Sequence, residues 1–332
     1  MKLPALIPAE EMDFPAYLGD PMPEPSLTSS LVKDLLSTAP RKVWQNTKRL
    51  NKDAQDARKT EFDLGTAAHA MFTGSGEPIV VIDAADFRSK AAKEQREQAY
   101  ALGKTPILKK DMARVDAMAT AALEQFGENP DIGKFFNSPM GAETLREATI
   151  MWSEAGAMHR CRPDFYHLEE NVVIHYKTTG VTISPNELSK YAANMGWYLT
   201  AAHYAAGAKM LTGNAPKQYF AVQETTAPHL CIVAELDATF MANAEMRRAR
   251  AITIWAKCLR ENNWPGFPNR TVKLECPEWL ERNLIADKDA EQDAINNGTD
   301  LLEMARAWSA PDWQPPATMI TADELFSDEV TE

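Results

Sequence analysis

This sequence has no closely spaced cysteines, no long apolar run and no apolar N-terminal signal, features that would identify a protein's class directly. Its four cysteines (Cys161, Cys231, Cys258 and Cys276) lie far apart and form no CxxC pair. Such spacing favours buried free thiols over a disulfide framework, an iron–sulfur cluster or a structural zinc site. No run of about 18 apolar residues is present, so no membrane-spanning helix is predicted. The first twenty residues carry acids and prolines where a signal peptide would be apolar, and we expect a cytoplasmic protein.

The charge is unevenly distributed along the chain. The net charge of −12 argues against a nucleic-acid partner, because phosphate contacts require Lys and Arg. However, residues 41–59 and 88–114 are rich in Lys and Arg, whereas acids dominate beyond residue 286. The basic segments fit a DNA-binding surface and solvated helix faces equally well.

The pattern along the chain predicts a leader, one domain and a tail. Residues 1–27 are rich in proline and aperiodic and indicate an extended leader. Residues 28–285 contain the helical and strand patterns of a single α/β domain, and residues 286–332 form an acidic tail that we expect to be irregular. In the first half of the domain, helices are expected from about residue 28 to Pro40 and over 61–72, 86–103 and 109–126, with a strand over 79–82.

The second half of the domain is rich in strands. Residues 146–152, 158–166 and 171–179 are short segments with many β-branched and aromatic residues, separated by turn formers. They predict three consecutive antiparallel strands. Next come a helix from Ser184 to about Ala206, strands over 217–225 and 229–236, and a long helix over 237–262.

A small set of polar residues lies on these predicted strands. His175 and Lys177 are two residues apart, so their side chains share one face of a strand. Asp164 lies near the end of the preceding strand and can lie close to them across a short turn, and Glu147 is on the strand before that. Carboxylates bind Mg²⁺ through oxygen, and a nearby lysine can orient an attacking water or neutralise developing charge.

The spacing D-x(n)-[DE]-x-K across two strands is the outline of a PD-(D/E)XK nuclease core, a mixed β-sheet flanked by helices. Other interpretations of the same residues remain open: Asp164 can cap a turn, and Lys177 can be a charge that protects an edge strand.

Several collinear segments resemble the RecE-type exonucleases, which are exodeoxyribonuclease VIII-like members of this superfamily, and their phage relatives. The segments are SLTSSLVKDLLSTAP, LGTAAHAMF, ADFRSKAAKEQREQAYALGKTPIL, RPD followed by a strand ending in KTT, and FAVQETTAPH with a later WPGF. The resemblance extends over roughly residues 25–270. It implies that His69 lies near the metal, Glu147 is the acid of the first strand, Asp164 is the principal metal ligand and Lys177 is the catalytic lysine.

The chain departs from the family pattern at two positions. The family's second carboxylate, two residues before the lysine, is His175 here, and its Tyr-x-x-Gln-x-x-x-Tyr helix motif has Asn194 for glutamine, between Tyr191 and Tyr198. We assign His175 as a metal ligand, and Asn194 and Tyr198 to the catalytic set. A neutral imidazole ligates Mn²⁺ better than Mg²⁺. Natural change of metal use, an introduced substitution and a misaligned motif all remain open.

The resemblance implies Mg²⁺- or Mn²⁺-dependent 5′→3′ digestion of one strand of double-stranded DNA from its ends. It also implies a homo-oligomeric ring around DNA and a single-strand annealing protein as partner. In such a ring the basic segments are expected to face the channel, with the acidic tail outward. The alternatives are a catalytically silent DNA-binding or regulatory protein that keeps the fold, and a nuclease of RNA or single strands.

Overall fold

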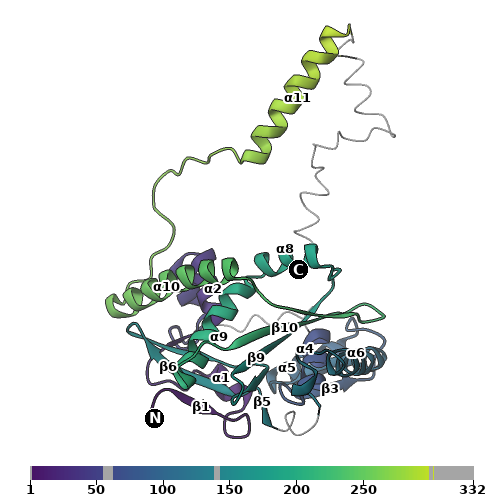
Figure 1. Cartoon of the computed structure of the whole chain (residues 1–332), viewed down its shortest axis with the longest axis vertical. Helices are drawn as coiled ribbons and strands as arrows, with labels where there is room; N and C mark the ends of the chain where they lie inside the picture. The colour runs from purple at the N-terminus through teal and green to yellow at the C-terminus, as the bar shows by residue number, and fades with distance from the viewer. Residues whose placement is uncertain (1, 55–62, 138–142, 299–301, 303–332) are drawn as a thin grey trace. The chain divides into compact units, whose positions relative to one another are not determined.

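The computed structural model describes residues 2–54, 63–137, 143–298 and 302. The chain divides into two compact units, Met1–Phe267 and Pro268–Glu332. The first unit contains mixed sheets flanked by helices, as the sequence predicts (Figure 1). Among the helices of the described residues, none is long and apolar enough to cross a bilayer.

A five-stranded mixed sheet forms the centre of the first unit. Its strand order is β11-β10-β9-β8-β5. Strands β9 and β10 run parallel and the other neighbours antiparallel. Both faces of β9 are covered, since Ile174 and Tyr176 pack in one apolar cluster with Phe72 and Val173 packs in another with Trp152. The strands are β5 (Thr144–Arg146), β8 (Phe165–His167), β9 (Val172–Thr179), β10 (Lys217–Glu224) and β11 (Cys231–Ala234).

A four-stranded sheet of order β1-β6-β7-β2 includes the N-terminal residues. Residues 1–27, expected as an extended leader outside the domain, supply β1 and β2, which pair with β6 and β7. The buried Arg160 of β7 also binds Asp20, with 3.0 Å between Nη1 and Oδ1. Strands β1 and β2 have only three and two residues, which is too short for a sequence pattern to predict. The bounds of the four strands are β1 (Ala5–Ile7), β2 (Ser26–Leu27), β6 (Thr149–Glu154) and β7 (Ala157–Cys161).

Two of the predicted strands, 146–152 and 158–166, are each interrupted by a break in the structure. The segment 146–152 forms the end of β5 and most of β6, and the segment 158–166 forms β7 and β8. Because β5 pairs with β8 and β6 with β7, the two breaks lie opposite each other where the chain passes between the sheets. Pro163 has no N–H for a ladder bond, and Glu147 adopts a φ of 53°, which strand residues do not.

The helix predicted from Ser184 to Ala206 is in fact two helices, α8 (Pro185–Asn194) and α9 (Trp197–Thr212). Gly196 separates them with a φ of 64°. A Cβ at this position would lie 2.8 Å from Cδ of Lys33, so glycine suits both the conformation and the close approach. Helix α9 packs with α2 (Ser29–Ser37) and α10 (Ala238–Glu261) around Trp255 (Figure 1).

The remaining elements of the first unit lie mainly in the helical N-terminal part. Strands β3 and β4 form a parallel pair. Only β3 was predicted from the sequence, because Pro106 interrupts the pattern of β4. Helix α4 packs against α6 through Ala67 and Val115. The bounds are α1 (Phe14–Leu18), α3 (Pro40–Asn46), α4 (Asp63–Thr73), β3 (Ile79–Ile82), α5 (Lys90–Ala101), β4 (Thr105–Leu108) and α6 (Lys109–Gly127).

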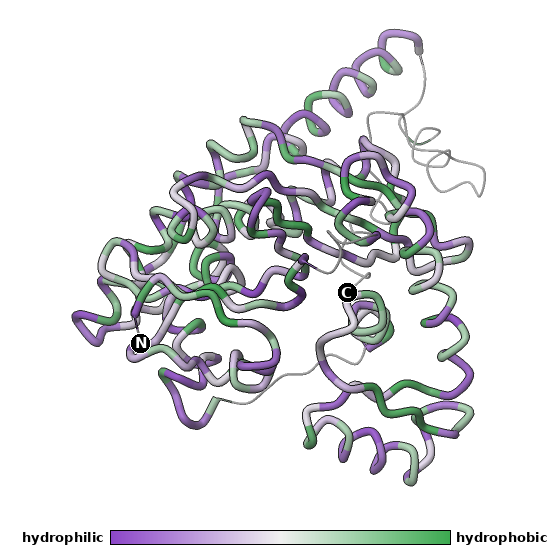
Figure 2. Tube along the Cα trace, turned by 60° about the horizontal axis from the view of Figure 1, so that its bottom comes forward, coloured by the Kyte–Doolittle hydropathy of each residue, from purple (hydrophilic) through white to green (hydrophobic). Residues whose placement is uncertain are grey.

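The second unit contains the helix α11 (Glu278–Asn296), which corrects the expectation of irregular structure beyond residue 286. The helix has three Glu, three Ala and two Leu and no glycine before Gly298, so the segment favours a helix despite its acidity. Its apolar side chains, such as Leu284 and Ile285, are exposed, and Figure 2 shows hydrophobic patches between longer hydrophilic stretches. The rest of the predicted tail, 299–301 and 303–332, lies outside the described residues.

Two buried histidines beside Trp152 predict a pH-dependent stability. His159 and His203 are fully buried, and each has one ring nitrogen hydrogen-bonded to a carbonyl. Burial, together with nearby Arg248, lowers the pKa of His159 to about 4, and burial also lowers that of His203. Folded histidines with lowered pKa bind fewer protons than unfolded ones, so stability is full above about pH 6.5 and falls as the pH drops toward 4.

For His159 alone we expect a loss on the order of 2 kcal/mol at pH 5 relative to pH 7.5. Urea unfolding at both pH values measures the loss, and His159→Gln should reduce it. Equal losses in the variant and the parent chain would contradict this assignment.

Candidate metal centre

The two strand breaks bring two carboxylates together. Glu147 lies between β5 and β6, and Asp164 lies between β7 and β8. The N–H of Glu147 donates to the carbonyl of Asp164 over 3.2 Å, which fixes the backbones side by side. Both residues are buried, at 5% and 8% exposure, so two acids share a region with little water. This is a costly arrangement unless cations balance it.

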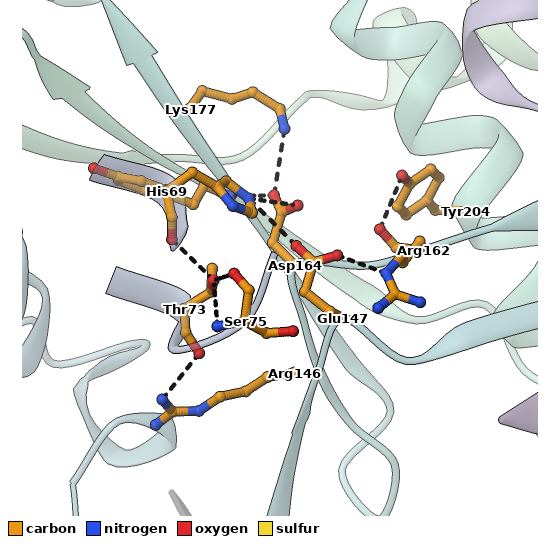
Figure 3. Close-up of polar contacts among 10 residues, drawn as sticks. His69, Thr73, Ser75, Arg146, Glu147, Arg162, Asp164, Lys177 and Tyr204 are labelled. Atoms are coloured by element: carbon orange, nitrogen blue, oxygen red, sulfur yellow. Dashed lines mark hydrogen bonds and ion pairs between the residues drawn. The ribbon is translucent and has the colours of Figure 1, made fainter. Parts of the chain in front are cut away.

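Helix α4 adds an imidazole to the two acids. His69 Nε2 lies 3.1 Å from Asp164 Oδ1 and 3.6 Å from Glu147 Oε1 (Figure 3). These ligand atoms lie within 4.8 Å of one another and form a possible metal site. The helix approaches β9 closely because Gly65 has no side chain: a Cβ there would lie 2.7 Å from Oγ1 of Thr178. Gly65 weakens the helix-forming pattern of this segment, but its lack of a side chain allows α4 to lie this close to β9.

The C-terminal end of α4 is anchored so that His69 keeps its place. The hydroxyl of Thr73 donates to the carbonyl of His69 over 2.8 Å, and Arg146 Nη1 donates to the carbonyl of Thr73 over 3.1 Å. Phe72 packs against Tyr176 of β9, with ring centroids 4.7 Å apart and the ring planes tilted by 50°. Polar and aromatic contacts thus hold the helix against the sheet on the side of the acids.

The other oxygen of each carboxylate already has partners. Asp164 Oδ2 accepts from the backbone N–H of Tyr176 at 2.7 Å and from Lys177 Nζ at 3.3 Å. Glu147 Oε2 accepts from Arg162 Nε at 2.8 Å. Each acid therefore turns one oxygen toward its supporting groups and the other toward His69, as Figure 3 shows.

The electrostatics separate the two acids. Burial opposes ionisation of Asp164, but Lys177 and His69 outweigh it and hold its pKa well below the usual value. Burial, with the neighbouring Asp164, raises the pKa of Glu147. Burial acts against protonation of His69, yet the acids beside it raise its pKa overall. Asp164 is the firmly ionised group, and a cation bound here would also favour the ionised form of Glu147.

The site is open on one side. The side chains of His69 and Lys177 are 26% and 31% exposed, against 7% for Glu147 and 11% for Asp164. Solvent and any ligand therefore reach the acids past the imidazole and the amine.

His175 does not join this group in the structure. Its Nε2 lies 3.0 Å from Gln218 Oε1, and its ring stacks on Phe220. The amide of Gln218 donates to the carbonyl of Ala201, so its oxygen faces the imidazole and accepts the proton of Nε2. Burial, followed by Lys177, lowers the pKa of His175 to about 4, which keeps the ring neutral. His175 shares a face with Lys177 but points into the core.

The helix residues assigned to the catalytic set also lie apart from the acids. Asn194 is exposed at the end of α8. Tyr198, two residues beyond the break at Gly196, packs with α2 and α10, and its hydroxyl accepts a hydrogen bond from Arg247. A continuous helix would have placed Tyr191, Asn194 and Tyr198 on one face, but the break at Gly196 rotates the second half.

Two groups that contact the acids were not selected from the sequence. Arg162 binds Glu147, and the backbone N–H of Tyr176 binds Asp164. The tripeptide Arg162-Pro163-Asp164 was noted for its acid alone. A backbone donor leaves no signal in a sequence, because every residue except proline has one.

The fold and this side-chain group define a protein of the PD-(D/E)XK superfamily. Residues 28–271 match the family DUF3799, described as a PDDEXK-like domain of unknown function, and the chain belongs to this family. The predicted fold class is thereby confirmed. A protein from Eubacterium rectale, provisionally assigned as an exonuclease, has a crystal structure that aligns with a TM-score of 0.48 and 12% identity, over 76% of this chain and 91% of that one. No curated protein sequence matches the chain.

Proposed function

We propose that this protein is a divalent-metal-dependent deoxyribonuclease that digests one strand of linear duplex DNA from its 5′ end. The observation that carries the proposal is the convergence of Asp164 Oδ1, Glu147 Oε1 and His69 Nε2, with Lys177 Nζ 3.3 Å from Asp164 Oδ2. Two acids, an imidazole and an amine at one open position are groups that can support metal-dependent hydrolysis of a phosphodiester.

The donor set suits a hard divalent cation. Two carboxylate oxygens favour Mg²⁺ or Mn²⁺, and the imidazole nitrogen of His69 shifts the preference toward Mn²⁺. The buried negative charge of Asp164 and Glu147 supports the same conclusion. When bound, such a cation would supply Lewis-acid stabilisation of the charge that develops on the phosphate.

The chain's own residues would orient the reaction. Asp164 and Glu147 would hold the cation with one oxygen each, since their other oxygens are bound by Lys177 and Arg162. Lys177, on the open side, would direct an N–H toward a phosphate oxygen or donate one to the attacking water and so orient it.

The finer features of the proposal come from the resemblance to RecE-type exonucleases. They are the duplex DNA substrate and the 5′ polarity, a ring of identical subunits around DNA, a single-strand annealing partner and a role in phage-type recombination. Basic segments 41–59 and 88–114 would face the DNA. Crosslinking of DNA to the protein tests this placement, and a lack of crosslinks within residues 41–114 would count against it.

A catalytically silent DNA-binding protein is the second candidate. The observation that favours it is His175, which occupies the position of the second carboxylate but is buried, neutral and bound to Gln218. Without that acid the site carries one negative charge fewer, which weakens cation binding.

Digestion of linear duplex labelled at the 5′ or the 3′ end, with Mg²⁺ or Mn²⁺, separates the candidates. We expect early release of the 5′ label, greater activity with Mn²⁺, and no digestion of closed circles. His175→Asp restores the acid of the family pattern, but the side chain at this position points into the core beside Gln218, so the variant should not exceed the Mg²⁺-dependent rate of the parent chain. If neither the parent chain nor His175→Asp cuts DNA with either metal, the silent protein is the correct assignment.

A further inference from the structure

Arg162 contacts three separate parts of the chain at the edge of the candidate metal centre. Its side chain is 3% exposed, and its Nε lies 2.8 Å from Glu147 Oε2. Its Nη1 donates to Thr149 Oγ1 over 3.0 Å and to the carbonyl of Met12 over 2.9 Å. The guanidinium also lies over the ring of Tyr17, 5.8 Å from its centroid. Every contact restrains the guanidinium in a single orientation.

The backbone of Arg162 is restrained as well. The hydroxyl of Tyr204 on α9 donates to the carbonyl of Arg162 over 3.2 Å (Figure 3). Pro163 follows, with its fixed φ, and Asp164 comes next. Arg162 thus contacts Glu147 through its side chain and is joined to Asp164 through the backbone of Pro163.

Glu147 needs such a partner for two reasons. Its backbone lies in the left-handed region, at a φ of 53°, so neighbouring groups must hold the residue in place. Its carboxylate is also buried beside that of Asp164, and an unbalanced pair of buried acids would repel. A guanidinium is planar and always charged, so it can fix one carboxylate oxygen while keeping its other contacts.

We propose that Arg162 is a positioning residue that holds Glu147 by Oε2 and so directs Oε1 toward His69 and Asp164, where a divalent cation binds. The inference rests on the proposed function, because it assigns Arg162 to the same metal site. The N-terminal segment takes part, since Met12 and Tyr17 help to fix the guanidinium.

Arg160 provides a matched control. Arg160 is also buried, lies two residues earlier and forms a buried ion pair with Asp20 at 3.0 Å. Its other hydrogen bonds are to the carbonyl of Tyr17 and to Ser26, and it does not contact Glu147. Breaking either pair leaves a buried acid without its partner, so the general cost to stability is similar. Only Arg162 touches a proposed ligand.

Calorimetric titration with Mn²⁺ alone tests the inference in a double-mutant cycle of Arg162→Gln and Glu147→Gln, with thermal melting to show that each variant is folded. Arg162→Gln should weaken Mn²⁺ binding about 10- to 100-fold. In the Glu147→Gln background the same change should have little further effect, because Arg162 acts through Glu147. Arg160→Gln reaches Arg162 only indirectly, through Tyr17, and should change the Mn²⁺ affinity much less than Arg162→Gln does.

Wild-type affinity in a folded Arg162→Gln variant, or an equal loss in both backgrounds, would overturn the inference. If Arg162→Gln does not fold, Arg162→Lys keeps the charge without the planar fork and should still weaken binding about 10-fold, and unchanged affinity there would overturn it equally. A parent chain that binds no Mn²⁺ would instead overturn the proposed function, and the inference with it.

Discussion

Asp164→Asn should remove metal-dependent cleavage almost completely while leaving the protein folded. Asparagine keeps an oxygen that can accept from the N–H of Tyr176, so the local backbone is preserved. The negative charge is lost, and with it the firmly ionised ligand of the site. A metal contributes several kcal/mol to such a transition state, so the rate should fall about 10³-fold or more. The rate on linear duplex and the Mn²⁺ affinity should both decrease.

Glu169→Gln is the matched control for this loss. Glu169 is an exposed acid in the turn between β8 and β9, close in sequence to Asp164 but outside the group of possible ligands. The control should keep the parent rate and affinity. Near-parental cleavage by Asp164→Asn would mean that the group formed by His69, Glu147 and Asp164 is not the catalytic metal site.

Lys177→Met should separate chemistry from metal binding. Methionine keeps much of the length of lysine without its charge, so the contact with Asp164 Oδ2 at 3.3 Å is lost. The maximal rate should fall about 10²- to 10³-fold, in the range expected for the loss of a donor that stabilises developing charge. Mn²⁺ affinity should be maintained or increased, because a cation that competes for Asp164 has been removed.

Single-turnover cleavage at saturating Mn²⁺ measures the first effect, and calorimetry measures the second. Lys217→Met, on neighbouring β10, removes an exposed lysine whose ion pair is with Glu235, and it should change neither quantity. A Lys177→Met variant with the parent rate, or one that binds Mn²⁺ far more weakly, would assign Lys177 a structural role instead.

The β-branched and aromatic residues of 171–179 were sufficient to predict β9, and the alternation of side chains along a strand placed Lys177 on one of its faces. The short turn before it was sufficient to place Asp164 nearby, and the structure brings their side chains together. The same pattern put His175 on the face of Lys177. It could not show that this position is deeper in the core, because depth depends on Gln218 and Phe220 of the adjacent strand.

The breaks in the strands had a weaker signal. Pro163 is an evident interruption, but nothing in the residue type of Glu147 announces a positive φ. That conformation is imposed where the chain leaves one sheet for the other. Likewise, Gly196 could be read as a weak point of a helix, but the rotation that separates Tyr198 from Asn194 follows from packing against α2 and α10.

The sequence by itself determined the fold class, most of the helices and strands, and the identity of the acid and the amine that meet at the site, since these depend on local periodicity and short turns. The family resemblance also implied His69 and Glu147, but only the tertiary structure decided how these and the remaining groups complete that site. His69 reaches it because Gly65 lets a helix approach β9, and Glu147 because two strand breaks lie opposite each other. Arg162 is fixed through the N-terminal segment, over 100 residues away in the chain. Contacts between distant segments depend on packing, which no local pattern encodes.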